Sequence, residues 1–404
     1  MDKKPVVLVG ALDTKGSEFL FVRDLIQKRG LQTMVVDFGV MGDPPFEPDV
    51  TADAVARAGG ASLAELRASG DKALAMRTMR DGLAVVVSGL HQEGRLGGIL
   101  GMAGSGGTSI ATAAMRGLPI GVPKVMLSTV ASGDVAAYVG TKDIVMMPSI
   151  VDVAGLNSIS RTIYANAAGA IAGMVEQEVP AGAGEKPLVT ASMFGNTTRA
   201  VDHARGLIEA QGYEVLVFHA VGSGGRTLES LIEAGFIAGN LDMTTTEIAD
   251  EVCGGVLSAG PERMLAAARM GVPTVLAPGC VDMANFWAID TVPEKYRGRK
   301  LYEWNPNVTL MRTNVEENRV MGEMICAAAN QAKGKVVILI PLKGVSQLDS
   351  PGGAFWDPEA NQACFNAIKA GLKPGIPVIE LDYNINDPEF SGKAADLLLE
   401  MLKA

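Results

Sequence analysis

GGILGMAGSGGTSIATAAMRG, residues 97–117, sets the fold class of this chain. Its apolar first part predicts a strand, Gly104–Gly107 a glycine-rich loop, and the part from about Thr108 a short helix. Gly117 stands where helices commonly end, and Pro119 follows it. Glycines let the backbone approach a ligand, and the first N–H groups of a helix have no intrahelical partner. The stretch therefore predicts a cradle for a phosphate or carboxylate, with a tight turn that binds nothing as the alternative.

The flanking sequence alternates strand and helix patterns. Residues 5–11 (PVVLVGA) are continuously apolar, which is typical of a strand buried on both faces. A polar turn at 13–16 leads to a predicted helix over 17–29 and a strand over 33–40, which together predict a parallel βαβ unit. The rest of this half predicts helices over 51–80 and 155–175, with strands at 85–90 or beside it, at 122–131 and at 143–149.

The pattern then starts again after PAGAGEKP (180–187), a short segment rich in Gly, Ala and Pro that predicts a linker. A shift of 182 residues lays KPLVTASMFGNTT on KPVVLVGALDTKG, and LVFHAVGSGG on MVVDFGVMGD. Further strands are predicted at 308–312, 336–341 and 377–382, and a last helix at 393–403. We therefore expect an α/β protein of two Rossmann-like parallel-sheet domains, residues 1–180 and 187–404, related by internal duplication and facing a cleft.

Composition bounds the partners and the compartment. The 404 residues carry a formal net charge of −10, which argues against nucleic acid or an anionic membrane surface as partner. The N-terminus lacks the shape of a signal peptide, and the four cysteines have no metal-type spacing. The sequence thus predicts a soluble, cytoplasmic protein, and a homo-oligomer is compatible with it.

Polar loops follow the predicted strands in both halves. Ligands of open parallel sheets bind beyond the carboxyl ends of the strands, so these loops are the candidate binding segments. In the first half they are the Asp13 loop, the loop 37–43, the glycine loop and the loop 128–134. Their expected counterparts are 195–199, 222–226, 259–262 and 278–282.

Five motifs together resemble one known family. They are LVGALDTKGSEF, the run from GMAGSGG to STVASGD, SMFGNTTRAVD, FHAVGSGGRTLE and QLDSPGGAFWDPEAN. The chain resembles, over essentially its whole length, the ATP-binding-domain family named after the tomato mosaic virus resistance protein, also filed as an uncharacterised family. The resemblance implies two Rossmann-like subdomains, with ATP and Mg²⁺ bound by the N-terminal one. In the plant member this domain blocks a viral replicase.

The candidate nucleotide site lies in the first half. The glycine loop would cradle phosphates, Lys15 would add a positive charge, and Asp37 stands where a Rossmann fold places the acceptor for ribose hydroxyls. Magnesium prefers one or two carboxylates and keeps several waters, so Asp134 is the metal candidate, with Asp13 and Asp43 as further carboxylates. The predicted cofactor-binding residues are Asp13, Thr14, Lys15, Asp37, Gly104, Ser105, Gly106, Gly107, Thr108, Ser128 and Thr129.

The second half predicts a site for a second anion, a small metabolite. Arginines there follow Gly- or Thr-rich loops and could grip a carboxylate or phosphate. The predicted residues are Asn196, Thr197, Arg199, Gly224 and Arg226. The segment 349–357 is polar, ends in aromatic residues and suits either a lid or a packed surface loop. No catalytic triad, metal cluster or kinase motif identifies a reaction, so the catalytic residues are unknown.

Three functions fit these observations. The first is an ATP-binding protein that acts on a small anionic metabolite in the interdomain cleft. The second is a nucleotide-gated module that binds another protein without catalysis, and the third is a sugar-nucleotide enzyme with two Rossmann-like domains. Polar loops in both halves favour the first.

Overall fold

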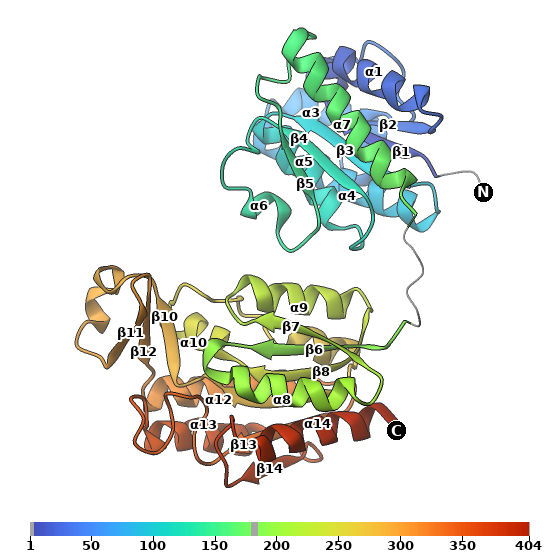
Figure 1. Ribbon diagram of the computed structural model, residues 1–404. Helices are drawn as coiled ribbons and strands as arrows, with labels where there is room; N and C mark the ends of the chain where they lie inside the picture. Colours follow the sequence, from blue (N-terminus) through green and yellow to red (C-terminus); the bar gives the residue numbers. More distant parts are fainter. Residues whose placement is uncertain (1–3, 179–184, 404) are drawn as a thin grey trace. The chain divides into compact units, whose positions relative to one another are not determined.

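The chain divides into two compact units, residues 1–181 and 182–404, in a computed structural model that describes residues 4–178 and 185–403. Each unit contains its own parallel β-sheet flanked by helices (Figure 1). Most of the predicted linker, residues 180–184, lies outside the described residues.

The first unit is built on a five-stranded sheet, sheet A, with the order β2-β1-β3-β4-β5 and all neighbours parallel. Every residue of β1 and β3 is buried, which accounts for their continuous apolar sequences. The elements are β1 (Val6–Gly10), α1 (Leu12–Lys28), β2 (Thr33–Asp37), α2 (Ala52–Ala58), α3 (Leu63–Ser69), α4 (Lys72–Gln92), β3 (Gly98–Ala103), α5 (Ser105–Arg116), β4 (Lys124–Ser128), α6 (Ala136–Val139), β5 (Val145–Pro148) and α7 (Ser158–Glu176).

Helices cover both faces of sheet A. Successive side chains of a strand point to opposite faces, so Val6 and Leu8 pack with α1 and α7, while Val7 and Val9 pack with α2, α4 and α5. This doubly wound arrangement leaves the two ends of the sheet for loops. The carboxyl ends of β1, β2 and β3 meet at one of them.

Two predicted boundaries in this unit were wrong. The strand at 85–90 belongs to α4, because Met79, Leu83 and Val87 are buried at helical spacing while Val85 is exposed. Helix α1 includes a first turn from Leu12, and its regular part follows the non-helical Lys15, close to the predicted start near residue 17. Helix α5 begins at Ser105, so most of the predicted glycine loop is its first turn.

The second unit contains a six-stranded sheet, sheet B, with the order β14-β13-β9-β8-β6-β7, and a three-stranded antiparallel sheet, sheet C, with the order β10-β12-β11. The elements are β6 (Leu188–Met193), η1 (Gly195–Thr197), α8 (Thr198–Glu209), β7 (Glu214–His219), α9 (Ser223–Glu233), β8 (Ile237–Thr244), α10 (Thr246–Cys253), α11 (Leu265–Met270), β9 (Thr274–Gly279), β10 (Met283–Phe286), η2 (Ile289–Thr291), η3 (Glu294–Tyr296), β11 (Leu301–Asn305), β12 (Val308–Arg312), α12 (Val315–Ala329), β13 (Val336–Pro341), α13 (Pro358–Gly371), β14 (Val378–Leu381) and α14 (Pro388–Lys403).

Sheet B repeats the strand order of sheet A. Read from β7, its order is β7-β6-β8-β9-β13-β14, which places the first five strands as in β2-β1-β3-β4-β5. All neighbouring strands of sheet B are parallel. The predicted fold class, two Rossmann-like α/β domains with parallel sheets, is therefore confirmed.

One element of the repeat was missed. Strand β8 corresponds to β3, so the counterpart of the β3–α5 junction is the β8–α10 junction at Thr245, and not the predicted loop 259–262. Strand β8 (IAGNLDMT) lacks a continuous apolar sequence because it contains Asn240 and Asp242. Both can be buried because their side chains bond Thr190 and Arg263. Among the described residues, no helix is long and apolar enough to cross a membrane.

Candidate functional site

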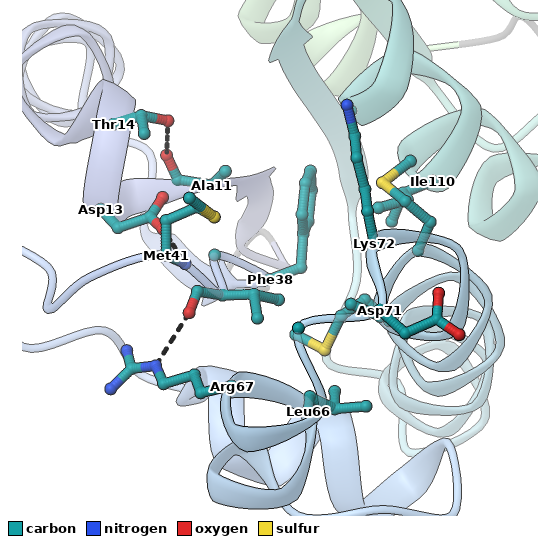
Figure 2. Close-up of a pocket in the computed structure, with 17 residues that line it drawn as sticks. Ala11, Asp13, Thr14, Phe38, Met41, Leu66, Arg67, Asp71, Lys72 and Ile110 are labelled. Atoms are coloured by element: carbon teal, nitrogen blue, oxygen red, sulfur yellow. Dashed lines mark hydrogen bonds between the residues drawn. The ribbon is translucent and has the colours of Figure 1, made fainter.

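A pocket of about 780 Å³ opens at the carboxyl end of sheet A (Figure 2). Strand β1 pairs with β2 on one side and with β3 on the other, and the pocket lies at the carboxyl end of β1 between these two directions. Ligands of doubly wound sheets usually bind at this position. Four segments line it: the start of α1, the loop 38–41 after β2, the α3–α4 corner and the first turns of α5. Its volume is in the range of small-molecule sites, roughly 300–1,000 Å³.

The pocket wall is mainly apolar. Phe38, Leu66 and Ile110 contribute large side chains, and Met76 and Met79 of α4 complete the wall. The charged lining residues are Asp13, Arg67, Asp71 and Lys72. Methionine side chains adapt to the shape of a ligand, so this wall suits a flat apolar ring with polar groups at its edge.

The N-terminus of α5 faces this pocket. Its N-cap, Gly104, offers no side-chain cap, and Gly107 of the first turn lines the pocket. A Cβ on Gly107 would lie 2.7 Å from the Cβ of Ala103, so the close approach of α5 to β3 requires glycine there. Of the predicted glycine loop only Gly107 lines the pocket, while Gly104, Ser105 and Gly106 lie outside its lining. The 12-residue helix therefore places the positive end of its dipole beside the pocket.

The predicted hydroxyl donors Thr108 and Ser128 bond each other instead. Their oxygens lie 2.6 Å apart, and the Thr108 hydroxyl also donates to the Gly104 carbonyl at 2.9 Å. Both residues are buried, and Thr129 bonds through its main-chain N–H to Ala103. These bonds fix the start of α5 and the ends of β3 and β4 to one another, so Thr108, Ser128 and Thr129 position the helix and lie outside the pocket lining.

Asp37 also holds the backbone rather than lining the pocket. Its Oδ1 accepts hydrogen bonds from the N–H groups of Leu12 at 3.0 Å and Gly39 at 2.8 Å. Burial raises the pKa of this carboxyl, and the two backbone hydrogen bonds oppose that rise. The sequence predicted a ribose acceptor at this position. The structure places there the group that shapes the loops after β1 and β2.

Asp13 is the carboxylate of the pocket wall. Its Oδ2 accepts from the N–H groups of Met41 at 2.7 Å and Gly42 at 3.1 Å, as Figure 2 shows in part. Its Oδ1 is buried and has no hydrogen-bond partner among the residues that the structure describes. Thr14 lines the pocket beside it, with its hydroxyl on the Ala11 carbonyl at 3.3 Å. An orphaned carboxylate oxygen in a pocket wall indicates a polar ligand or a cation.

Other predicted residues lie outside the pocket lining. Lys15 donates to the carbonyl of Val153 at 2.6 Å, so its ammonium is tied to the loop after β5. Asp134 accepts from the N–H of Ala136 at 2.9 Å and thereby caps α6. Asp43 contacts Arg67 at 3.4 Å on the surface.

The α3–α4 corner was not predicted as part of the site. Arg67, Asp71 and Lys72 line the pocket, within the segment 51–80 for which the sequence predicts only helical structure. The signal that could have found them is Ser69-Gly70-Asp71, a helix-ending glycine followed by an N-cap aspartate. Arg67 donates to the carbonyls of Val40 and Gly42, whereas Figure 2 shows the Lys72 side chain on the Ile110 side of the pocket.

In the second unit, an internal carboxylate occupies the loop 222–226. The N–H groups of Gly222 and Gly225 donate to Glu247 Oε1 at 2.7 and 3.0 Å. A Cβ on Gly225 would collide with that carboxylate, and one on Gly224 with the His219 carbonyl. These glycines therefore accommodate a side chain and a carbonyl of the chain itself.

The two predicted arginines differ. Arg226 donates to the carbonyl of Ser258 at 3.0 Å, while Arg199 is exposed near the start of α8. The second-anion site stays a prediction, and its loop 222–226 already binds an anionic group of the protein. Glu247 in turn accepts from the fully buried Arg263 at 2.7 Å, which also bonds Asp242.

The carboxyl end of sheet B is unusually polar and closed. Asn196 and Thr197 are buried, and the Thr197 hydroxyl lies 2.7 Å from that of Thr244. Asp282 accepts from Ser346 at 2.8 Å, and burial raises the pKa of Asp282 to about 7, with nearby Asp349 adding to the rise. The sequence left a lid and a packed surface loop open for 349–357, and the burial of Asp349 and Phe355 favours the packed loop.

Comparisons with known proteins give a family for both units. Residues 4–180 match the N-terminal domain of the uncharacterised protein family UPF0261, and residues 186–402 match its C-terminal domain. A UPF0261 protein of Clostridium tetani is 49% identical over the full length of both chains. The ToMV resistance protein Tm-1(GCR237) of Solanum lycopersicum is 42% identical over 340 residues, which cover 82% of this chain and 45% of that protein.

Among solved structures, the UDP-N-acetylglucosamine 2-epimerase of Rickettsia bellii matches with a TM-score of 0.23 and 10% identity, over 99% of this chain and 97% of that one. A likeness of this size does not bear on activity.

Proposed function

This chain belongs to the UPF0261 family, and we propose that its first unit binds ATP in the pocket at the carboxyl end of sheet A. The observation that carries the proposal is the meeting of two features in one pocket. These are the uncapped N-terminus of α5 and an apolar wall formed by Phe38, Met76 and Met79. A helix N-terminus stabilises phosphate groups, and the wall suits the purine ring.

Two side chains support a phosphorylated ligand with its cation. Lys72 adds an ammonium group to the pocket lining, and the orphaned Oδ1 of Asp13 offers a carboxylate oxygen to Mg²⁺, directly or through water. Asp13 is thus a better candidate for the metal than Asp134, whose carboxylate caps α6. In this proposal the phosphates approach the start of α5 at Gly107, the residue of the predicted cradle that lines the pocket.

The test is calorimetric melting of the full chain with ATP and Mg²⁺. At a hundred times its Kd, a ligand stabilises by about 2.7 kcal/mol. For a unit of this size, the melting temperature of the first unit should then rise by roughly 5–10 °C. Gly106→Asp should abolish the rise, because it places a carboxylate at the α5 N-terminus. Lys72→Met should weaken the binding of ATP about tenfold, because it removes a charge-assisted hydrogen bond.

Gly173→Asp is the matched control, because a Cβ at this helical glycine of α7 meets nothing within 4 Å. It adds the same charge to the same unit and should leave the ATP shift intact. An absent shift in the parent protein would overturn the proposal. A larger shift with UTP or a uridine diphosphate sugar than with ATP would favour a sugar-nucleotide enzyme instead.

A further inference from the structure

The second unit contains a polar centre that the nucleotide pocket does not use. Asn196, Thr245 and Asp282 are each at most 1% exposed. Asn196 Oδ1, Thr245 Oγ1 and Asp282 Oδ1 have no hydrogen-bond partner within the described part of the chain. The three residues follow β6, β8 and β9, which are neighbours in sheet B. Buried polar groups are nearly always bonded, so three orphaned atoms at one sheet end point to a ligand.

Hydrogen bonds bring these three residues to one place. The Thr245 N–H donates to the Gly279 carbonyl at 2.8 Å, and Asn196 Nδ2 lies 3.5 Å from Met283 Sδ. Asp282 lies within the same segment, 279–283. Neighbouring strands are about 4.8 Å apart, so the three strand ends span roughly 10 Å. A ligand that contacts all three residues must bridge that distance.

The three orphaned oxygens of this centre favour a ligand that donates hydrogen bonds. Asn196 Oδ1 and an ionised Asp282 Oδ1 can only accept, while the Thr245 hydroxyl can donate or accept. The buried carboxyls of Asp282 and Asp349 share one nearby guanidinium, that of Arg312, which lies 3.6 Å from Asp349. An anion placed here would meet a carboxylate without a full countercharge.

We propose that the carboxyl end of sheet B is a second binding site, for a small, non-anionic ligand rich in hydroxyl or amino groups. This inference does not depend on ATP binding by the first unit. It differs from the anionic metabolite that the sequence predicts at Asn196 and Thr197.

Sheet C covers the site. Its strand β12 contributes the buried Leu310 and Arg312, and the Trp304 ring of β11 lies 3.4 Å from where a Cβ on Gly195 would stand. Tyr302 of β11 meets Phe355 edge-on, with ring centroids 6.2 Å apart. Strand β11 is the outer strand of sheet C, so its aromatic side chains form the outer part of this cover.

The experiment measures by calorimetry how myo-inositol, glucosamine and ethanolamine bind to the full-length protein. Their anionic counterparts, inositol 1-phosphate, glucuronate and glycolate, serve as comparisons. At least one donor-rich probe should bind, and its counterpart should bind at least tenfold more weakly. Inositol alone would assign a polyol site, and the two amines alone would assign an amine site. Thr245→Val keeps the side-chain shape, removes the orphaned hydroxyl and should weaken the bound probe at least tenfold.

Thr309→Val is the matched control. The Thr309 hydroxyl is also buried and without a described partner, but Thr309 lies in β12 opposite Phe286. Its side chain therefore points to the face of sheet C opposite that of Leu310. This variant should bind the probe within twofold of the parent protein. The proposal is overturned if no donor-rich probe binds, if the anionic counterparts bind equally well, or if the two valine variants behave alike. ATP-induced melting shifts, measured in the same variants, report separately on the first unit.

Discussion

Asp250→Asn should stabilise the second unit at alkaline pH, although it removes a buried charged group. Asp250 lies in α10 with no exposed surface. Its Oδ1 accepts from the Asn285 N–H at 3.0 Å and the Leu257 N–H at 3.3 Å, and its Oδ2 accepts from Asn285 Nδ2 at 2.6 Å. Burial nevertheless dominates and raises the pKa of Asp250 from 3.8 to about 7, against the opposing hydrogen bonds.

The sign of the effect follows from proton binding. Between about pH 4 and 7 the folded state holds a proton that the unfolded state has released, so stability falls as pH rises through this window. The contribution of the protonated carboxyl is complete below the unfolded pKa and lost above the folded one. One pKa unit corresponds to about 1.4 kcal/mol, so ionisation costs the folded unit about 4 kcal/mol by pH 8.

Asparagine should avoid this cost and keep the hydrogen bonds of residue 250, at the expense of the 3.2 Å bond from Asn285 Nδ2 to Thr246. Its carbonyl oxygen can accept from both N–H groups, and its amide can donate to Asn285, whose Oδ1 has no described partner and faces it after an amide flip. Asp250→Asn should therefore match the parent protein within about 1 kcal/mol near pH 5 and exceed it by up to about 4 kcal/mol near pH 8.

Urea unfolding followed by tryptophan fluorescence measures this difference. The chain has three tryptophans, Trp287, Trp304 and Trp356, and all lie in the second unit, so the signal reports that unit alone. Asp290→Asn, at an exposed carboxylate of η2, is the control and should leave the pH profile unchanged. A variant less stable than the parent protein near pH 8, or a difference that does not change with pH, would refute the reasoning.

Two further predictions concern packing in the second unit, and the same fluorescence assay measures both. Arg263→Met should cost about 3–5 kcal/mol, because it leaves the carboxylates of Asp242 and Glu247 buried without their partner. Arg269→Met removes only an exposed ion pair and should cost far less than Arg263→Met; equal losses would contradict the argument. Gly322→Ala should cost about 1–3 kcal/mol, because its Cβ would collide with the Cys364 carbonyl of α13. Gly206→Ala in α8, where a Cβ meets nothing within 4 Å, should instead stabilise, and a loss there would be unexpected.

The sequence predicted sheet A better than its pocket. Strands such as β1 are buried on both faces, so every residue carries the apolar signal. The missed strand β8 lacks that signal, because its Asn240 and Asp242 are satisfied by partners 50 and 21 residues away. Hydrogen bonds over such separations cannot be read from local spacing. The same holds for Lys15, whose ammonium bonds Val153 of a distant loop.

The tetrapeptide Gly-Ser-Gly-Gly occurs in both units and has a different surrounding in each. At 104–107 it begins α5 beside the pocket, and at 222–225 it begins α9, where Glu247 accepts from two of its N–H groups. A helix N-terminus favours an anion in either case. In the second unit the chain supplies that anion itself, and Arg263 balances its charge. The motif therefore predicts where an anion can be held. Whether the anion is a ligand depends on which carboxylate the rest of the fold brings to that helix.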